Sequence, residues 1–503
     1  MVEDEYINIE KMTYIPTIQK NRGHGWFYRR PGLGRLMEDD RRRTWVSYSP
    51  SWPRFYGYHQ FDKAHLVMLL EEQIIPRDEG IRCLRALRLM ENEGIDQARE
   101  QIGGIAHSGE AYLTMKFGWW TGGWIHAGRS SHDLNTVNQR ITQRNYLLDV
   151  MDKVNDLRET LITLSEQHVN TIMPYWSHGQ RGRPITLAFY FMTWVKMLER
   201  DFERLILCYK HTNISPAGTS EGTGTDFPLN PHRTAELLGF DAVYENANDM
   251  WLTDDFRIEA FATLMTIGTP LRRLGEDLQL WSGWEYRIAD LADRWCGTSS
   301  IMAHKKNPHA IYTLPIGERS ARTRIHLGSA EEFAIAVRDI VNSLQIAREI
   351  LQTTSWDTDR MMEFCHSGWL CIPDLARSLC VSKGLPWRMA HQICATLVRL
   401  ATEEGKSEQD VTSALLDRAA IAYPAFGQPL HASEQFIRDA LNPINSIHAR
   451  IVHGSTSPPQ VQNQIVTSHQ TLLHDKQITT LKRKQLQDAE QLLETSITRL
   501  LSN

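Results

Sequence analysis

Residues 297–308 read Gly297-Thr298-Ser299-Ser300-Ile301-Met302-Ala303-His304-Lys305-Lys306-Asn307-Pro308. Small residues let the backbone approach a ligand closely. The same stretch offers a lysine for a carboxylate, an amide donor, and a hydroxyl that takes up a proton if its charged form is stabilised. The alternative is an ordinary loop of turn residues with solvated lysines. The composition of the loop therefore favours, without requiring, the binding of a small dianion.

Long helices are predicted on both sides of this loop. Apolar residues step by three and four over residues 146–168 and again over 191–209. Further helical stretches are predicted at 254–293 with a kink at Pro270, at 316–355, and at 469–501. Strand-like alternation is nearly absent from the middle of the chain. This pattern predicts an all-α protein built on a long helix bundle.

Three domains are predicted from changes in composition along the chain. Residues 1–125 form an irregular arm, rich in Pro, Gly, Trp, Tyr and Arg, followed by a small helical domain. Residues 126–367 form the central bundle. Beyond residue 368 the helices shorten and Pro and Gly recur, which predicts a C-terminal helical domain over 368–503.

Composition excludes several classes of function. The chain has 503 residues, 42% of them hydrophobic and 23% charged, as in soluble globular proteins. A net charge of −5 supplies no basic field for a nucleic acid or an anionic membrane. Seven cysteines without zinc-module spacing indicate reduced, mostly buried thiols. The acidic start of the chain lacks the pattern of a secretory signal, and no apolar stretch is long enough to span a bilayer. We therefore predict a cytoplasmic protein.

The loop at 297–308 resembles GSSxMPxKxNP, the signature loop of the fumarase/aspartase superfamily, and its Lys-Lys-Asn-Pro ending is most like argininosuccinate lyases. Residues 173–184, MPYWSHGQRGRP, are similar to the family segment MPGYTHLQRAQP. Residues 126–133, HAGRSSHD, resemble HTGRSRND. Weaker matches extend from about residue 60 to 465. The chain is identified as a divergent member of the argininosuccinate lyase family.

This resemblance implies a fold, a reaction and an assembly. Family members cleave a carbon–nitrogen or carbon–oxygen bond next to a succinyl group and mostly release fumarate, so the implied partner is a small dicarboxylate. They have a long central bundle and are homotetramers whose active sites each draw three loops from different subunits. No metal or organic cofactor is implied.

The resemblance also assigns roles to residues of the three segments. Ser299 is the base, and Lys305 and Asn307 hold the carboxylate that takes up charge, with Ser300 beside them. His178 assists proton transfer to the departing nitrogen. The remaining implied substrate-binding residues are Ser130, His132, Ser177 and Gln180. Without the resemblance, His178 is also compatible with an ordinary surface position, and Ser130 is also compatible with the role of a helix cap.

Four departures from the family pattern concern the substrate. Ser131 and His132 replace an Arg and an Asn that hold carboxylates. Tyr312 replaces a Glu that pairs with the active-site His, and a hydroxyl would favour charged His178 much less than a carboxylate would.

The fourth departure lies in the counterpart of the segment YNRDLQEDK, which contacts substrate in argininosuccinate lyases. This counterpart is residues 340–348, allowing a one-residue shift, with Ile340 for the Tyr and Arg348 for the Lys. Gln345 survives and either binds substrate or lies on an ordinary helix face.

Three hypotheses follow. The first is a carbon–nitrogen lyase that eliminates fumarate from an aspartate or succinate N-linked to an amine other than arginine, or that runs the reverse addition. The second is a true argininosuccinate lyase of arginine biosynthesis. The third is a catalytically inactive structural or regulatory homologue.

Overall fold

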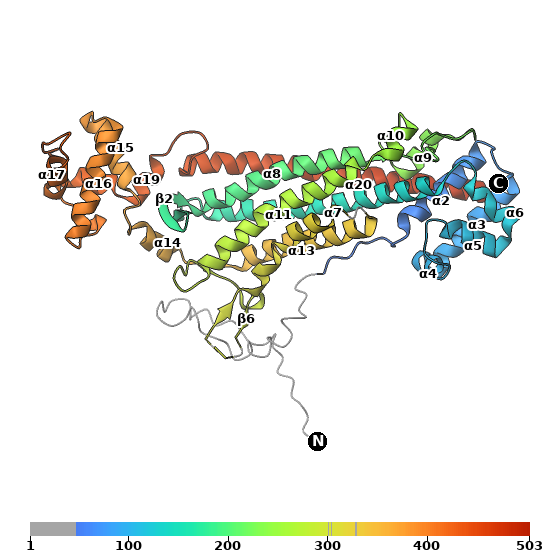
Figure 1. Ribbon diagram of the computed structural model, residues 1–503, viewed down its shortest axis with the longest axis horizontal. Helices are drawn as coiled ribbons and strands as arrows, with labels where there is room; N and C mark the ends of the chain where they lie inside the picture. Colours follow the sequence, from blue (N-terminus) through green and yellow to red (C-terminus); the bar gives the residue numbers. More distant parts are fainter. Residues whose placement is uncertain (1–46, 300, 303, 327–328, 503) are drawn as a thin grey trace, which may run out of the picture.

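The computed structural model describes residues 47–299, 301–302, 304–326 and 329–502. Its centre is a bundle of long helices that run roughly side by side along the longest axis of the molecule (Figure 1). The bundle contains α7 (Ser131–Gln167), α8 (Leu187–Thr212), α11 (Asp255–Trp281), α12 (Ile316–Arg324), α13 (Ala330–Thr353) and α20 (Pro458–Ser502). The predicted all-α bundle is thus confirmed.

The bundle is held together by one apolar core. Leu147 of α7, Phe191 of α8, Leu264 of α11 and Ile340 of α13 are each fully buried in it. These positions belong to the three-and-four spacing of the predicted helices, so the stripe faces the core. Burial of side chains this large contributes roughly 1.5–3 kcal/mol each relative to exposure.

Two of the predicted helical stretches are shortened or divided in the structure. The stretch predicted at 254–293 ends at Trp281, where Ser282 and Gly283 follow, and Pro270 lies inside the continuous helix. The stretch predicted at 316–355 is divided into α12 and α13. Ser329 caps the second of these, because its Oγ accepts a hydrogen bond of 3.1 Å from the Glu332 amide. Apolar residues continue at helical spacing past Trp281 and between α12 and α13, so the sequence pattern does not reveal these two helix ends.

Short helices gather at the two ends of the bundle (Figure 1). One end carries α2 (Tyr56–Glu71), α3 (Arg77–Glu93), α4 (Ile95–Glu100), α5 (Ser108–Phe117), α6 (Trp119–Gly122), η4 (Gly123–His126), α9 (Pro231–Leu238) and α10 (Ala247–Leu252). The other carries α14 (Thr358–Cys365), α15 (Ile372–Lys383), α16 (Trp387–Glu403), η7 (Glu408–Asp410), α17 (Ser413–Ala422), α18 (Glu434–Ala440) and α19 (Pro443–His448).

The last helix, α20, extends from the second end back to the first (Figure 1). Val461 and Ile465 lie in the core of the bundle, whereas Leu493, Ile497 and Leu500 lie in the core of the N-terminal helices. Residues 375–440 have a separate apolar core. The domain boundaries at 125 and 367 stay predictions. Helix α20 packs on the central bundle and on the N-terminal helices.

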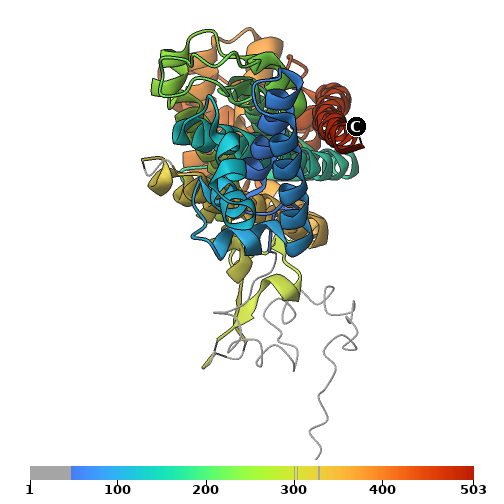
Figure 2. The ribbon, with the colours of Figure 1, turned by 90° about the vertical axis from the view of Figure 1, so that its right-hand side faces the viewer.

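Eight short strands form two-stranded pairs among the described residues. They are β1 (Ile172–Ser177) with β2 (Gln180–Thr186), β3 (Ile214–Ser215) with β4 (Ala242–Val243), β5 (Ala289–Asp290) with β8 (Ser355–Trp356), and β6 (Gly297–Thr298) with β7 (Lys306–Asn307). Both views show that the β6–β7 hairpin projects away from the bundle (Figures 1 and 2). No described helix combines the length and apolarity needed to cross a membrane.

Candidate functional site

The loop at 297–308 is the connection of the β6–β7 hairpin. Gly297 pairs with Asn307 and Thr298 with Lys306 in antiparallel register, so Ser299, Ile301, Met302, His304 and Lys305 belong to the connection between the two strands. Ile301 is 86% exposed at its tip. The hairpin therefore presents the predicted catalytic loop outward, on a base fixed by strand pairing.

Ser299 is held by the backbone of its own loop. Its Oγ accepts a hydrogen bond of 3.0 Å from the Met302 amide and a longer one of 3.4 Å from the Ile301 amide. Donors to an oxygen favour its charged form, so these two amides would stabilise an alkoxide at Ser299 if one formed. Ser300, the neighbouring predicted binding residue, lies outside the described residues.

The two adjacent lysines of the loop have different environments. Lys306 is anchored, with Nζ 2.8 Å from Asp290 Oδ1 and 2.9 Å from Asp293 Oδ1, and it donates to the Leu291 carbonyl. Burial lowers the pKa of Lys306, but the carboxylates more than offset this and raise it well above its ordinary value. Lys305 is exposed. Lys305 is therefore the lysine of this pair that is accessible to a substrate carboxylate.

The predicted His178 segment is a β-hairpin between α7 and α8. Ser177 pairs with Gln180 across a two-residue turn in which His178 has φ 53° and Gly179 has φ 72°. Two successive positive φ values define a type I′ turn, which requires Gly or a tolerant residue such as His. Gly179, where the family has an apolar residue, is thus explained by the turn. Ser177, His178 and Gln180 all lie exposed at its tip.

The third segment begins helix α7. Ser130 is the N-cap, and its Oγ accepts from the His132 amide at 3.1 Å and donates to the Ser220 carbonyl at 2.9 Å. The alternative interpretation of this segment as a helix cap is therefore confirmed. The N-terminus of a helix also attracts anions, because its free amides carry partial positive charge. A substrate carboxylate at Ser130 would have to displace the bond to Ser220.

His132 takes part in an aromatic contact on the same corner. Its ring centroid lies 3.8 Å from that of Trp251 in α10, and its Nε2 is buried without a hydrogen-bond partner among the described residues. Burial lowers the pKa of His132, so the neutral ring is favoured. This corner therefore offers a neutral aromatic surface where the family has an amide side chain.

Comparison with known proteins identifies the family. A lyase family model matches residues 99–315, and a model described as argininosuccinate lyase C-terminal matches residues 370–448. An argininosuccinate lyase of Methanococcoides burtonii is 31% identical over 83% of this chain and 87% of its own length. The chain belongs to the argininosuccinate lyase family. As a member of the fumarase/aspartase superfamily, it is a carbon–nitrogen lyase.

Solved structures show the same fold. A crystal structure of EDDS lyase in complex with formate superposes with a TM-score of 0.85 and 26% identity, covering 97% of this chain and 99% of that chain. An EDDS lyase variant with bound fumarate superposes with the same TM-score at 25% identity.

The segment that contacts substrate in argininosuccinate lyases has a different environment here. Ile340, at the position of the family Tyr, is fully buried, and a Cβ added to Gly317 of α12 would approach its side chain to 2.6 Å. Arg348, at the position of the Lys, lies 3.9 Å from Asp156. Gln345 donates to Glu349 at 3.3 Å, and Glu349 lies 3.5 Å from Arg294 next to the base of the signature hairpin. Of these three residues, Gln345 is linked through Glu349 and Arg294 to the base of the signature hairpin.

The three candidate segments do not meet within one chain of this argininosuccinate lyase homologue. Ser130 begins α7 and the His178 hairpin follows its end, and a helix of 37 residues spans about 55 Å. The signature hairpin projects from the bundle elsewhere (Figure 1). Tyr312, which stands where the family has the Glu partner of the active-site His, is 54% exposed in η6 (His309–Thr313).

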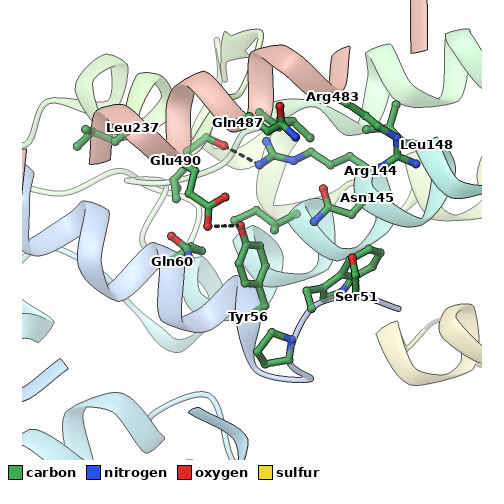
Figure 3. A pocket seen from close by; sticks show the side chains of 15 residues that line it. Ser51, Tyr56, Gln60, Arg144, Asn145, Leu148, Leu237, Arg483, Gln487 and Glu490 are labelled. Atoms are coloured by element: carbon green, nitrogen blue, oxygen red, sulfur yellow. Dashed lines mark hydrogen bonds between the residues drawn. The ribbon is translucent and has the colours of Figure 1, made fainter. Parts of the chain in front are cut away.

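A cavity of about 320 Å³ lies between the segment at 51–53, α2, α7 and α20 (Figure 3). None of its described lining residues is a predicted site residue. Its arginines serve the fold: Arg483 binds Asp149 and Asp152, and Arg144 donates to Asn213 Oδ1 and the Leu238 carbonyl. This cavity is separate from the candidate catalytic segments.

Two residues that support the site were not singled out from the sequence. Asp133 accepts from the Ser130 amide at 2.8 Å and, at 3.1 Å each, from the Gly218 amide, the Thr219 hydroxyl and the Ser220 amide. It thereby joins the start of α7 to the family segment that begins at residue 216. Lys306 supports the signature hairpin in the same way. Asp133 and Lys306 both lie within the segments that resemble the family motifs, and this position is the signal that could have found them. The spacing of residues along the chain does not distinguish a side chain that supports the fold from one that binds substrate.

Proposed function

We propose that the protein eliminates fumarate from an aspartate or succinate that is N-linked to an amine other than arginine, or adds such an amine to fumarate. The observation that carries the proposal is the burial of Ile340 in the core between α12 and α13. A buried isoleucine cannot replace the hydrogen bonds of a tyrosine to a polar substrate. The likeness to EDDS lyase, which includes a variant with bound fumarate, supports a reaction that forms or consumes fumarate.

The proposed chemistry uses the signature loop first. The Ser299 alkoxide, stabilised by the Met302 amide, removes a proton from the carbon next to one substrate carboxylate. Lys305 and Asn307 neutralise the charge that develops on this carboxylate, which is usually the largest catalytic contribution. The carbon–nitrogen bond then breaks with formation of the double bond of fumarate, and His178 donates a proton to the departing nitrogen.

The other segments hold the substrate in this proposal. The start of α7 with Ser130 receives the second carboxylate, aided by the helix dipole. Ser177 and Gln180 at the hairpin tip, Ser300, and Gln345 of α13 supply hydrogen bonds. The neutral His132–Trp251 pair borders the amine.

The proposed active site is shared between the subunits of a homotetramer. One α7 of 37 residues separates Ser130 from the His178 hairpin, so a single chain cannot bring both to one substrate. Leu207, Ile258 and Leu280 on the bundle are each at least 50% exposed, which suits burial against further copies.

A true argininosuccinate lyase is the second candidate. Identity to the archaeal argininosuccinate lyases and retention of Gln345 favour it. The inactive homologue is disfavoured by the retention of Ser299, Lys305, Asn307 and His178.

The deciding experiment incubates the protein with fumarate and a panel of amines that includes arginine and follows the loss of fumarate. Ser299→Ala is the control for the base, with circular dichroism to show that it is folded. We expect turnover with an amine other than arginine and a rate at least about 10³-fold lower in the variant. Turnover with arginine alone would exclude the first candidate, and activity that survives in Ser299→Ala would remove the assigned base.

A second experiment tests the shared site. Ser299→Ala and His178→Ala are each expected to be inactive, but mixing them under mild denaturation and refolding should restore part of the activity. Restoration occurs because some mixed sites receive both native loops. A mixture that stays inactive would show that each chain supplies both residues itself.

A further inference from the structure

We propose that His107, Glu110 and His126 form a binding site for a divalent transition-metal ion such as Zn²⁺ or Co²⁺. The three side chains come from the start of α5 and the end of η4. Each offers a ligand atom, and all three atoms lie within 4.8 Å of one another. The two imidazole rings face each other with centroids 5.1 Å apart.

The distances fit tetrahedral coordination. His107 Nδ1 lies 3.3 Å and His126 Nδ1 lies 3.1 Å from the same oxygen, Glu110 Oε2. In a tetrahedral site with bonds of about 2.0–2.1 Å, neighbouring ligand atoms are about 3.3–3.4 Å apart. The trio therefore closes around an ion with small side-chain shifts and leaves a fourth position open.

The orientation of His126 suits an ion shared with Glu110. Its Nδ1 is buried but makes no aligned hydrogen bond with any described residue, although Glu110 Oε2 is close. A buried polar atom without a partner is costly. An ion bound to both His126 Nδ1 and Glu110 Oε2 does not lie on the line between these two atoms. The lone pair of Nδ1 must therefore point to one side of Oε2 and not directly at it. The side chains of His107, Glu110 and His126 are 36%, 21% and 37% exposed, which leaves a path for an ion.

The donor set determines the class of ion. Two imidazoles and one carboxylate suit zinc and related transition ions and are poor for magnesium or calcium, which prefer oxygen ligands. The sequence predicts no zinc module, because its cysteines lack the spacing of one and these two histidines are 19 residues apart in different elements. The bound ion would fasten α5 to the segment that leads into Ser130.

The test measures binding of Co²⁺ and Zn²⁺ to the full chain after removal of any purification tag. We expect one ion per chain by equilibrium dialysis and a higher melting temperature with Zn²⁺. Co²⁺ should give the visible d–d absorption of a nitrogen and oxygen site, without the charge-transfer bands of thiolate ligands. Thiolate bands, or no bound ion in the wild type, would overturn the proposal.

Variants locate the site. His107→Ala, His126→Ala and the milder His126→Gln should abolish binding at concentrations that saturate the wild type. The matched control is His211→Ala, because His211 also lies close to a single glutamate, 2.8 Å from Glu259, but outside the trio. Unchanged binding in folded His126→Gln, or loss of binding in His211→Ala, would contradict the assignment. Ser299→Ala should bind normally, so this result is independent of the proposed lyase chemistry.

Discussion

The ammonium group of Lys306 lies 2.8 Å from the carboxylate of Asp290, and this ion pair closes the base of the signature hairpin. Lys305, the preceding residue, is exposed on the turn. Two adjacent lysines thus have different tasks, one in the fold and one, in our proposal, in the chemistry.

We predict that Lys305→Met and Lys306→Met fail in different ways. Lys305→Met should lower kcat by about 10²–10³-fold with an unchanged melting temperature, because it removes one charge-stabilising donor. Lys306→Met should lower the free energy of unfolding by about 3 kcal/mol, because it leaves two carboxylates without their cation. Thermal unfolding and steady-state kinetics on both variants check this. Equal effects on stability would show that the assignment of the two lysines is wrong.

The His178 turn gives a backbone prediction. Gly179→Ala places a Cβ in open space but at φ 72°, whereas Gly123→Ala places one in open space at φ −68°. The first should cost about 1–2 kcal/mol of local stability and lower kcat/KM several-fold, because the turn positions His178. Gly123→Ala should leave the local stability of the turn and kcat/KM unchanged. Hydrogen exchange at the amides of Ser177 and Gln180 reports the local effect, and identical exchange in both variants would refute it.

A buried ionic cluster supports the segment before Ser130. Asp62 accepts from Arg99 at 2.6 Å and from Arg129 at 2.8 Å, and all three side chains are at most 1% exposed. Burial opposes its charge, but the two guanidinium groups hold the pKa of Asp62 below its ordinary value.

We predict that Asp62→Asn lowers the free energy of unfolding by about 3–5 kcal/mol, because two buried cations lose their counter-charge. The control is Glu403→Gln, which breaks a solvent-exposed pair with Arg399 and should cost less than about 1 kcal/mol. Urea unfolding measures both. A similar small loss in the two variants would mean that the cluster is not important for stability.

Stability should fall on mild acidification because of His65. Burial, with the charge of Arg129, lowers the pKa of His65 to about 3, and its Nε2 lies 2.9 Å from the Ala127 carbonyl. The unfolded chain takes up a proton near pH 6.5, but the folded chain does so only near pH 3. Between these values the unfolded state binds more protons, so this residue costs about 1.4 kcal/mol per pH unit as the pH falls.

His65→Gln keeps a donor for Ala127 and does not titrate, so its stability should depend less steeply on pH. Urea unfolding at pH 7.5 and pH 5.5 compares the slopes of the two proteins. Burial also lowers the pKa of His59, so some dependence should remain in the variant. An unchanged slope would contradict the role of His65.

The sequence predicted those parts of the fold in which apolar spacing and burial coincide. The predicted helix at 146–168 corresponds to the second part of α7, which ends at Gln167 and begins fifteen residues before 146, at Ser131. Its first half buries Arg140, Gln143 and Arg144, whose polar groups bond to carbonyls and side chains of neighbouring segments. Because periodicity counts apolar residues, it cannot detect a core-facing stripe made of satisfied polar ones.

The sequence predicted which residues belong to the candidate site, but it did not predict how they are arranged in space. Resemblance located Ser299, His178 and Ser130, yet only the backbone shows that His178 and Gly179 form a type I′ turn. Helix length shows that the segments are too far apart to meet within one chain. The metal trio was missed because His107 and His126 become neighbours only through the packing of α5 against η4.

Helix α20 has a consequence for biosynthesis. Leu493, Ile497 and Leu500 complete the apolar core formed by α2 and its neighbours, and Glu494 binds Lys63 and Arg88 there. Helix α2 and its neighbours are therefore translated more than 400 residues before the segment of α20 that completes their core. Until then the nascent chain keeps this apolar surface exposed, and this surface is where a chaperone would bind.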